Sequence, residues 1–116
     1  MVVNLHKIQP GEDTLCKESV EHFLQNRDRL FVEIPRILIY ICNNQPFKYY
    51  AIDGNSRLFV CYKLGIMDIP IEPEIPDCEE LYLPTALEVY SQVIRRWADL
   101  EKRIITELER DRLQYV

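Results

Sequence analysis

The sequence predicts an α+β fold, in which a small mixed β-sheet with short helices is followed by one long C-terminal helix. Short runs rich in β-branched and aromatic residues alternate with turn residues through the first part of the chain. A stretch rich in proline and acidic residues follows. From Thr85 onward, apolar residues recur at helical spacing, and no Gly or Pro interrupts them. We therefore divide the chain into a core (1–72), a connector (73–84) and an amphipathic helix (85–116).

Composition restricts the classes of function. The 116 residues fit one domain, and a hydrophobic content of 47% is enough to build a core. The net charge of −5 argues against direct non-specific DNA binding, which needs a basic face, although a local phosphate site remains compatible with it. No apolar run is long enough to cross a membrane. The cysteines lack metal-site spacing, so we expect reduced thiols in a cytoplasmic protein: Cys16, Cys42, Cys61 and Cys78.

In the core region, the sequence predicts three strands and one amphipathic helix before the central motif, and a fourth strand after it. Alternating or β-branched residues indicate strands at 2–7, 35–41, 48–52 and 68–71. The second and third of these strands should form a hairpin or lie close together, because turn residues separate them. Apolar residues at helical spacing predict a helix from about Thr14 to Arg27.

The central motif follows the third strand and predicts an anion site. Asp53 and Gly54 form a tight turn, and Asn55 or Ser56 can cap the short buried helix that follows. The first N–H groups of that helix and its positive end would lie beside an exposed Arg57. Backbone donors, a helix N-terminus and a guanidinium in one place are best suited to a phosphate group.

The same residues carry a family resemblance. The run Asp53-Gly54-Asn55-Ser56-Arg57, followed by Leu64-Gly65 and Ile69-Pro70-Ile71, resembles the ParB/sulfiredoxin superfamily over roughly residues 2–72. The usual form there is Asp-Gly-His-His-Arg, or Gly-Glu-Arg-Arg in chromosome-partitioning members. The resemblance implies a ParB-like nucleotide-binding module whose loop, residues 53–57, grips the phosphates of CTP, ATP or ADP.

Some family features are missing. Sulfiredoxin-like members carry a catalytic Cys at the place of Asn55, so sulfinic-acid reduction is not implied. Partitioning members have Glu-Arg at Asn55-Ser56 and a later Glu-Asn-x-x-Arg motif, which this chain lacks. Arg95-Arg96 could reach the phosphate site from the long helix, but a solvated face is the simpler interpretation.

Two carboxylates are candidates for chemistry. Pro10-Gly11-Glu12 resembles the Pro-His-Glu of ParB-like free serine kinases, which implies Glu12 as a general base. The simpler alternative is an acidic residue favoured by the dipole of a following helix. Asp53 could hold Mg²⁺ beside the phosphates or orient a hydroxyl, or it could only form the turn. The sequence leaves open whether the protein is an enzyme.

The predicted long helix suggests a partner. Thr85 and Glu88 form a capping box, and an apolar face runs from Tyr90 through Trp97 to Leu108. Such a helix would be roughly 40 Å long. It should therefore form a homodimer, dock on a partner protein or bury its Trp97 face on its own domain. Three functions stay open: a nucleotide- or phosphate-binding module, including a phosphotransferase or hydrolase; a non-catalytic interaction or dimerisation protein; or a DNA-partitioning accessory that contacts DNA through a partner.

Overall fold

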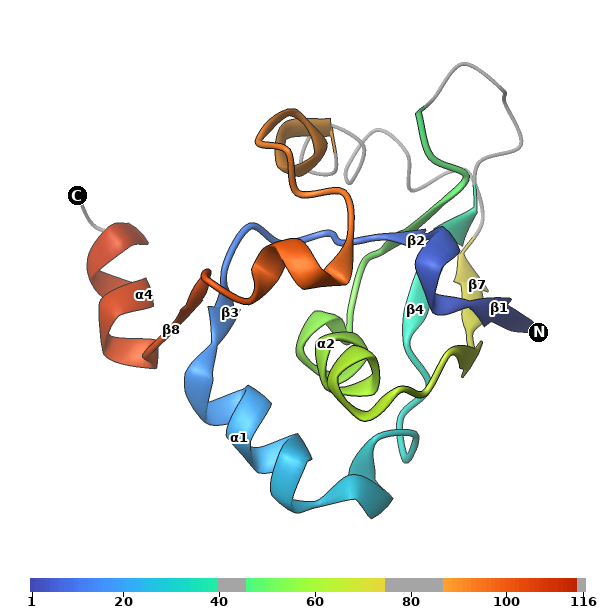
Figure 1. The fold of residues 1–116 in the computed structure, drawn as a ribbon, viewed down its shortest axis with the longest axis horizontal. Coiled ribbons are helices and arrows are strands. Elements are labelled where there is room, and N and C mark those ends of the chain that lie inside the picture. The colour runs from blue at the N-terminus through green and yellow to red at the C-terminus, as the bar shows by residue number, and fades with distance from the viewer. Residues whose placement is uncertain (40–45, 75–86, 115–116) are drawn as a thin grey trace.

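A computed structural model of the chain describes residues 1–39, 46–74 and 87–114. These residues form an α+β domain in which short helices and small mixed sheets surround a central helix, α2 (Asn55–Leu64) (Figure 1). The predicted α+β class is therefore confirmed, together with the short elements of the N-terminal region. Within the described ranges, no helix is long and apolar enough to cross a membrane.

The main sheet has four strands that pair in the order β2-β5-β4-β7. β2 runs parallel to β5, β5 runs antiparallel to β4, and β4 runs parallel to β7. The expected pairing of the second and third predicted strands is confirmed, because Ile37 of β4 lies opposite Ala51 of β5. The strand bounds are β2 (Ile8–Gln9), β5 (Tyr49–Ala51), β4 (Arg36–Ile39) and β7 (Glu72–Glu74).

The N-terminal strand is shorter than predicted. β1 (Val2–Asn4) is followed by a 3₁₀ turn, η1 (Leu5–Lys7), before the chain enters β2. The Asn4 side chain accepts a hydrogen bond from the His6 N–H at 2.9 Å, which favours the turn over a continuous strand. Leu5 is then completely buried. β1 pairs antiparallel with β6 (Asp68–Pro70), so the strand predicted at 68–71 is present.

Helix α2 lies at the centre of the fold and packs against α1 (Lys17–Gln25), β3 (Leu15–Cys16) and η4 (Trp97–Leu100). Its residues from Leu58 to Cys61 are at most 1% exposed. Gly65 ends the helix at φ 74°, and its N–H donates to the carbonyls of Cys61 and Tyr62. Helix α1 begins at Lys17 rather than near Thr14, because Leu15 and Cys16 pair in parallel with β8 (Ile104–Ile105).

The prediction of a long C-terminal helix over residues 85–116 was wrong. The described part holds a helical segment at 87–91, η4, β8 and a short helix, α4 (Glu107–Gln114). Val93 has φ 64°, a left-handed conformation that ends the first segment. The chain turns there, which brings Trp97 and Leu100 into the core of the same domain. The Trp97 indole N–H donates to the Ile8 carbonyl at 3.1 Å.

This outcome changes the domain division and the expected partner. Trp97 packs within its own chain, which was one of the three predicted alternatives. The long helix that was expected to mediate dimerisation is not formed. A homo-oligomer remains a prediction, but this helix no longer supports it. Pro73 and Glu74, which the sequence predicts to lie in the connector, are in β7. The rest of the connector and the capping residue Thr85 lie outside the described residues.

Candidate functional site

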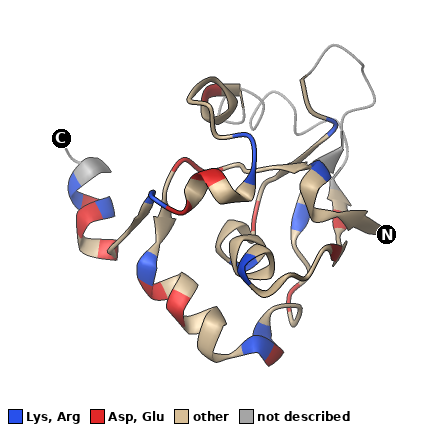
Figure 2. Ribbon diagram, viewed as in Figure 1, with Lys and Arg blue, Asp and Glu red and all other residues tan. Residues whose placement is uncertain are grey.

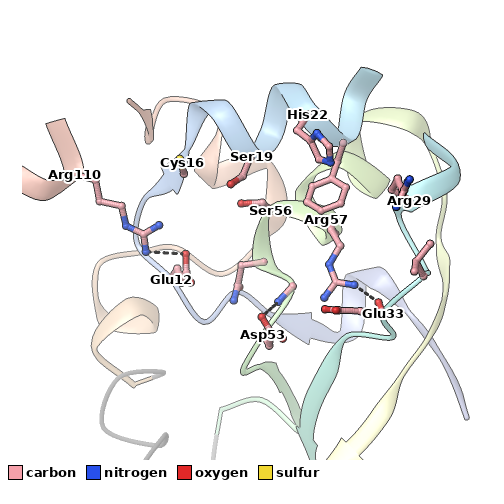
Figure 3. Close-up of a pocket in the computed structure, with 14 residues that line it drawn as sticks. Glu12, Cys16, Ser19, His22, Arg29, Glu33, Asp53, Ser56, Arg57 and Arg110 are labelled. Atoms are coloured by element: carbon pink, nitrogen blue, oxygen red, sulfur yellow. Dashed lines mark hydrogen bonds and ion pairs between the residues drawn. The ribbon is translucent and has the colours of Figure 1, made fainter. Parts of the chain in front are cut away.

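Two motifs that are far apart in the sequence, at 10–12 and 52–57, meet at one edge of the main sheet. Because β2 and β5 are parallel, the segment after β2 (10–12) and the segment after β5 (52–54) leave the sheet at the same end. A cavity of about 490 Å³ opens there, between the sheet edge, α1 and the start of α2. We call it the carboxyl-end cavity. All six predicted site residues line it: Glu12, Asp53, Gly54, Asn55, Ser56 and Arg57 (Figure 3).

Gly54 forms the turn into α2. Its φ of 83° lies in the left-handed region that favours glycine, and an added Cβ would lie 2.8 Å from Nη2 of Arg57. Gly54 is itself the residue that precedes the helix, so the prediction that Asn55 or Ser56 caps it was wrong. The exposed Asp53 carboxylate accepts the Gly54 N–H at 2.8 Å, which stabilises the turn.

Asn55 joins the two loops that form the cavity floor. Its side chain is only 3% exposed, and its Oδ1 accepts the Gly11 N–H at 2.9 Å. Its Nδ2 donates to the Ala51 carbonyl at 3.5 Å. Gly11 is packed so closely that an added Cβ would collide with the same Ala51 carbonyl oxygen. Asn55 therefore holds the 10–12 loop in place, and its side-chain polar atoms are used within the protein.

Arg57 is buried, contrary to the expectation of an exposed side chain. It is 6% exposed, and its Nη1 donates to the backbone carbonyl of Glu33. Within the described ranges, no carboxylate lies within ion-pair distance of this guanidinium. A buried cation with no acidic partner is unfavourable unless hydrogen bonds or a bound anion offset its desolvation. Figure 3 shows its side chain along the cavity wall, close to Glu33.

The first turn of α2 faces the same cavity. The Leu58 N–H donates to the Gly54 carbonyl at 2.9 Å, whereas the three preceding amides belong to the helix N-terminus, which has no intrahelical acceptors for them. The half-buried Ser56 side chain points into the cavity, and Ser19 of α1 faces it from the other wall (Figure 3). Hydroxyls, amide donors and a positive helix end thus converge there.

Glu12 is paired with a residue that sequence reasoning missed. Nη2 of Arg110, in α4, lies 3.3 Å from Oε2 of Glu12. Burial raises the pKa of Glu12 above its ordinary value, Arg110 opposes that shift, and the negative charges of Asp13 and Asp53 add to it. Arg110 is 98 residues away from Glu12 in the sequence, and the predicted long helix gave no reason to place it here.

Helix α1 and Cys16, the residue that precedes it, supply polar side chains whose spacing is visible in the sequence. Cys16, Ser19 and His22 recur every three residues, and this spacing places side chains on one face of a helix. All three line the carboxyl-end cavity, together with Arg29 from η2 (Arg27–Arg29). By contrast, Arg95 and Arg96 do not line this cavity.

The described residues contain no group of three His, Cys, Asp or Glu side chains arranged to hold a metal ion. Asp53 could serve as one ligand. Mg²⁺ is commonly held by one or two carboxylates together with water and substrate phosphates, so Asp53 fits a cation that arrives with a nucleotide. Cys61 is buried, and burial raises the pKa of its thiol to about 11, which makes it a poor nucleophile.

Comparisons with known proteins add little to this geometry. A scan against models of protein families gives no match, and a search of curated proteins also gives none. Among solved structures, the chain is similar to the crystal structure of protein Atu1540 from Agrobacterium tumefaciens, with a TM-score of 0.49 and 12% identity. The match covers 92% of this chain and 61% of that chain, so this chain spans less than two thirds of the other. A similarity at this level carries no argument about function.

Proposed function

We propose that the carboxyl-end cavity binds the phosphate group of a nucleotide or of another small phosphorylated molecule. The observation that carries this proposal is the buried Arg57, which faces the cavity beside the N-terminus of a ten-residue helix. Its planar guanidinium can grip two phosphate oxygens, and the first amides of α2 can bind a third. The resemblance to ParB/sulfiredoxin proteins supports the same ligand class.

The charges around the cavity favour a nucleotide that carries Mg²⁺. Three arginines line it, and three acidic residues lie among them: Arg29, Arg57 and Arg110, with Glu12, Glu33 and Asp53. A free anion would meet those carboxylates, whereas a phosphate–Mg²⁺ pair presents both signs of charge. Asp53 is the exposed carboxylate at the turn and is the proposed contact for the cation. CTP, ATP and ADP are the first ligands to test.

The direct test is thermal unfolding with a panel of CTP, ATP, ADP, GTP and pyrophosphate, each with and without Mg²⁺. A ligand at about 100 times its dissociation constant should stabilise the fold by about 2.7 kcal/mol. For a domain of this size, that gain raises Tm by roughly 10 °C or more. If no phosphate-bearing ligand raises Tm at millimolar concentration, the proposal is wrong, and an interaction protein becomes the better reading.

The Ser56→Asp variant separates an effect on ligand binding from an effect on stability better than any substitution of Arg57. Arg57→Ala would remove a buried side chain and leave the Glu33 carbonyl without its donor, so lost binding could reflect lost stability. An acidic residue in the first turn of α2 suits the helix dipole but repels phosphate. Ser56→Asp should therefore fold normally and lose the ligand-induced rise in Tm. Ser91→Asp, at an exposed serine outside the cavity, is the matched control.

The cavity also favours catalysis of phosphoryl transfer or hydrolysis as a second candidate function. Glu12 is a carboxylate of raised pKa in the same cavity, and such a group can accept a proton from an attacking hydroxyl or water. Glu12→Gln should keep nucleotide binding and abolish release of phosphate or ADP, measured with serine and other hydroxyl acceptors. If the wild-type protein and the Glu12→Gln variant are equally inactive, Glu12 is not a general base.

A further inference from the structure

A second cavity opens at the opposite ends of the same two parallel strands. Its volume is about 520 Å³, and it lies where η1 leads into β2 and where residues 46–48 lead into β5. We call it the amino-end cavity. Its other side is lined by Tyr90, from the 87–91 helical segment, and by Arg95, from the chain between that segment and η4. It shares no lining residue with the carboxyl-end cavity.

Aromatic rings hold two of its cations. The guanidinium carbon of Arg95 lies 4.2 Å from the centre of the Tyr90 ring, and Nζ of Lys48 lies 5.5 Å from the centre of the Tyr49 ring. The Phe47 ring lies 5.8 Å from that of Tyr90, tilted by 50°. The cavity therefore presents flat apolar surfaces with positive groups fixed on them.

The charge of this cavity differs from that of the whole chain. Lys7, Lys48 and Arg95 line it with His6, and none of its described lining residues is acidic, although the net charge of the protein is −5. Figure 2 shows basic residues in the segments before β2, before β5 and before η4, around the upper part of the view. Such a concentration of positive charge in an acidic protein favours an anionic ligand.

We propose that the amino-end cavity binds a nucleoside phosphate unit, with its phosphate on Lys7 and Lys48 and its base stacked on Arg95 and the neighbouring rings. A guanidinium already stacked on a tyrosine offers its second face to a base, and base stacking tolerates any sequence. The unit can belong to a free nucleotide or to single-stranded nucleic acid. This proposal does not depend on the function proposed for the carboxyl-end cavity.

Fluorescence anisotropy of a labelled single-stranded oligothymidylate tests the proposal, with thymidine monophosphate as a competitor. Arg95→Gln should weaken binding about tenfold because it removes the stacking plane. Lys48→Gln should weaken binding and reduce the salt dependence by about one counterion. Lys63→Gln is the matched control: Lys63 pairs with Glu101 at 3.1 Å, outside both cavities, and its loss should leave the affinity unchanged.

The competitor distinguishes the two sources of the ligand. If the monophosphate binds as tightly as the oligonucleotide, a free nucleotide is the ligand; tighter binding of the oligonucleotide identifies single-stranded nucleic acid. Ser56→Asp should bind both probes like wild type, which separates this site from the other cavity. The proposal fails if neither probe binds saturably, if Arg95→Gln and Lys48→Gln bind like wild type, or if polyglutamate displaces the oligonucleotide equally well.

Discussion

The two ends of the β2–β5 pair carry two different kinds of surface. At the carboxyl end, the polar residues Asn55 and Arg57 are buried and bonded to backbone groups. At the amino end, Lys7, Lys48 and Arg95 are exposed. Buried side chains therefore help to form the carboxyl-end cavity, whereas the basic side chains of the amino-end cavity lie on the surface. Substitutions at the carboxyl end should cost stability as well as binding, and those at the amino end should cost binding alone.

Gly11→Ala should have the largest effect on stability, because it disrupts the packing at the carboxyl-end cavity. It should leave the amino-end cavity unchanged. The added Cβ would collide with the Ala51 carbonyl oxygen, which belongs to β5 and cannot move freely. We expect a loss of about 3 kcal/mol in the free energy of unfolding, measured by urea denaturation. Gly65→Ala is the control: that site has open space and positive φ, so only about 1 kcal/mol should be lost. Equal losses would contradict the collision.

Asn55→Ala should cost about 2 kcal/mol, because it removes the acceptor of the Gly11 N–H inside the cavity floor. Asn26→Ala offers a comparison on the surface, where the Asn26 side chain bonds to the carbonyl of His22. Its loss should change stability by less than about 0.5 kcal/mol. Thermal and urea unfolding of the two variants provide the measurement. Similar values for both would mean that the floor of the carboxyl-end cavity is no more rigid than the exposed surface.

Val93→Gly should stabilise the protein by about 1 kcal/mol. It tests whether stability can change near the amino-end cavity without a change in binding there. Val93 is 68% exposed and has φ 64°, so glycine would relieve backbone strain with little loss of packing. The segment that contains Val93 also carries Tyr90 and Arg95 to the amino-end cavity. A higher Tm with unchanged oligonucleotide affinity is the expected result. A lower Tm would show that the left-handed turn is not strained.

The smallest expected change is in the pH dependence of stability, and it concerns Glu12. Its pKa is raised in the folded protein, so between the ordinary value near 4.5 and the raised value the folded state binds more protons than the unfolded state. Stability from this group is present below that range and is lost as pH rises through it. Glu12→Gln should therefore gain stability relative to wild type as pH rises from about 4 to 7. A difference that stays constant with pH would contradict the shift.

The sequence predicted the local elements of the N-terminal region better than the path of the C-terminal third. The turn at Gly54, the buried helix that ends at Gly65 and the antiparallel pair of β4 and β5 depend on neighbouring residues, which a sequence shows directly. The prediction of a long helix was wrong because the apolar residues on its expected face have different environments in the fold. Trp97 and Leu100 are buried, while Val93 and Leu108 are more than 60% exposed. A regular spacing alone does not show which residues a fold will bury.

Tertiary packing decided the parts of the site that were missed. Arg57 looks like a surface residue in the sequence, yet it is buried beneath the Gly54 turn. Arg110 reaches the cavity only because β8 pairs with β3 and thereby directs α4 toward Glu12. Strands that pair over such a long separation in the chain leave no local pattern in the sequence. The three-residue spacing of Cys16, Ser19 and His22 is visible in the sequence, but the same spacing is common on solvated helix faces, so it does not by itself indicate a cavity.

The pairing of β3 with β8 also has a consequence for the order of folding. Leu15 pairs with Ile104, and Glu12 meets Arg110, so both contacts join segments made early and late in synthesis. Closing loops of this length costs entropy that only the finished contact repays, and such distant pairings slow folding. During translation, the β2–β5 strands and α2 can assemble first, while the wall contributed by α4 must wait for residue 110. A ribosome-bound chain that stops short of α4 would therefore hold the Gly54 turn without the Glu12–Arg110 pair.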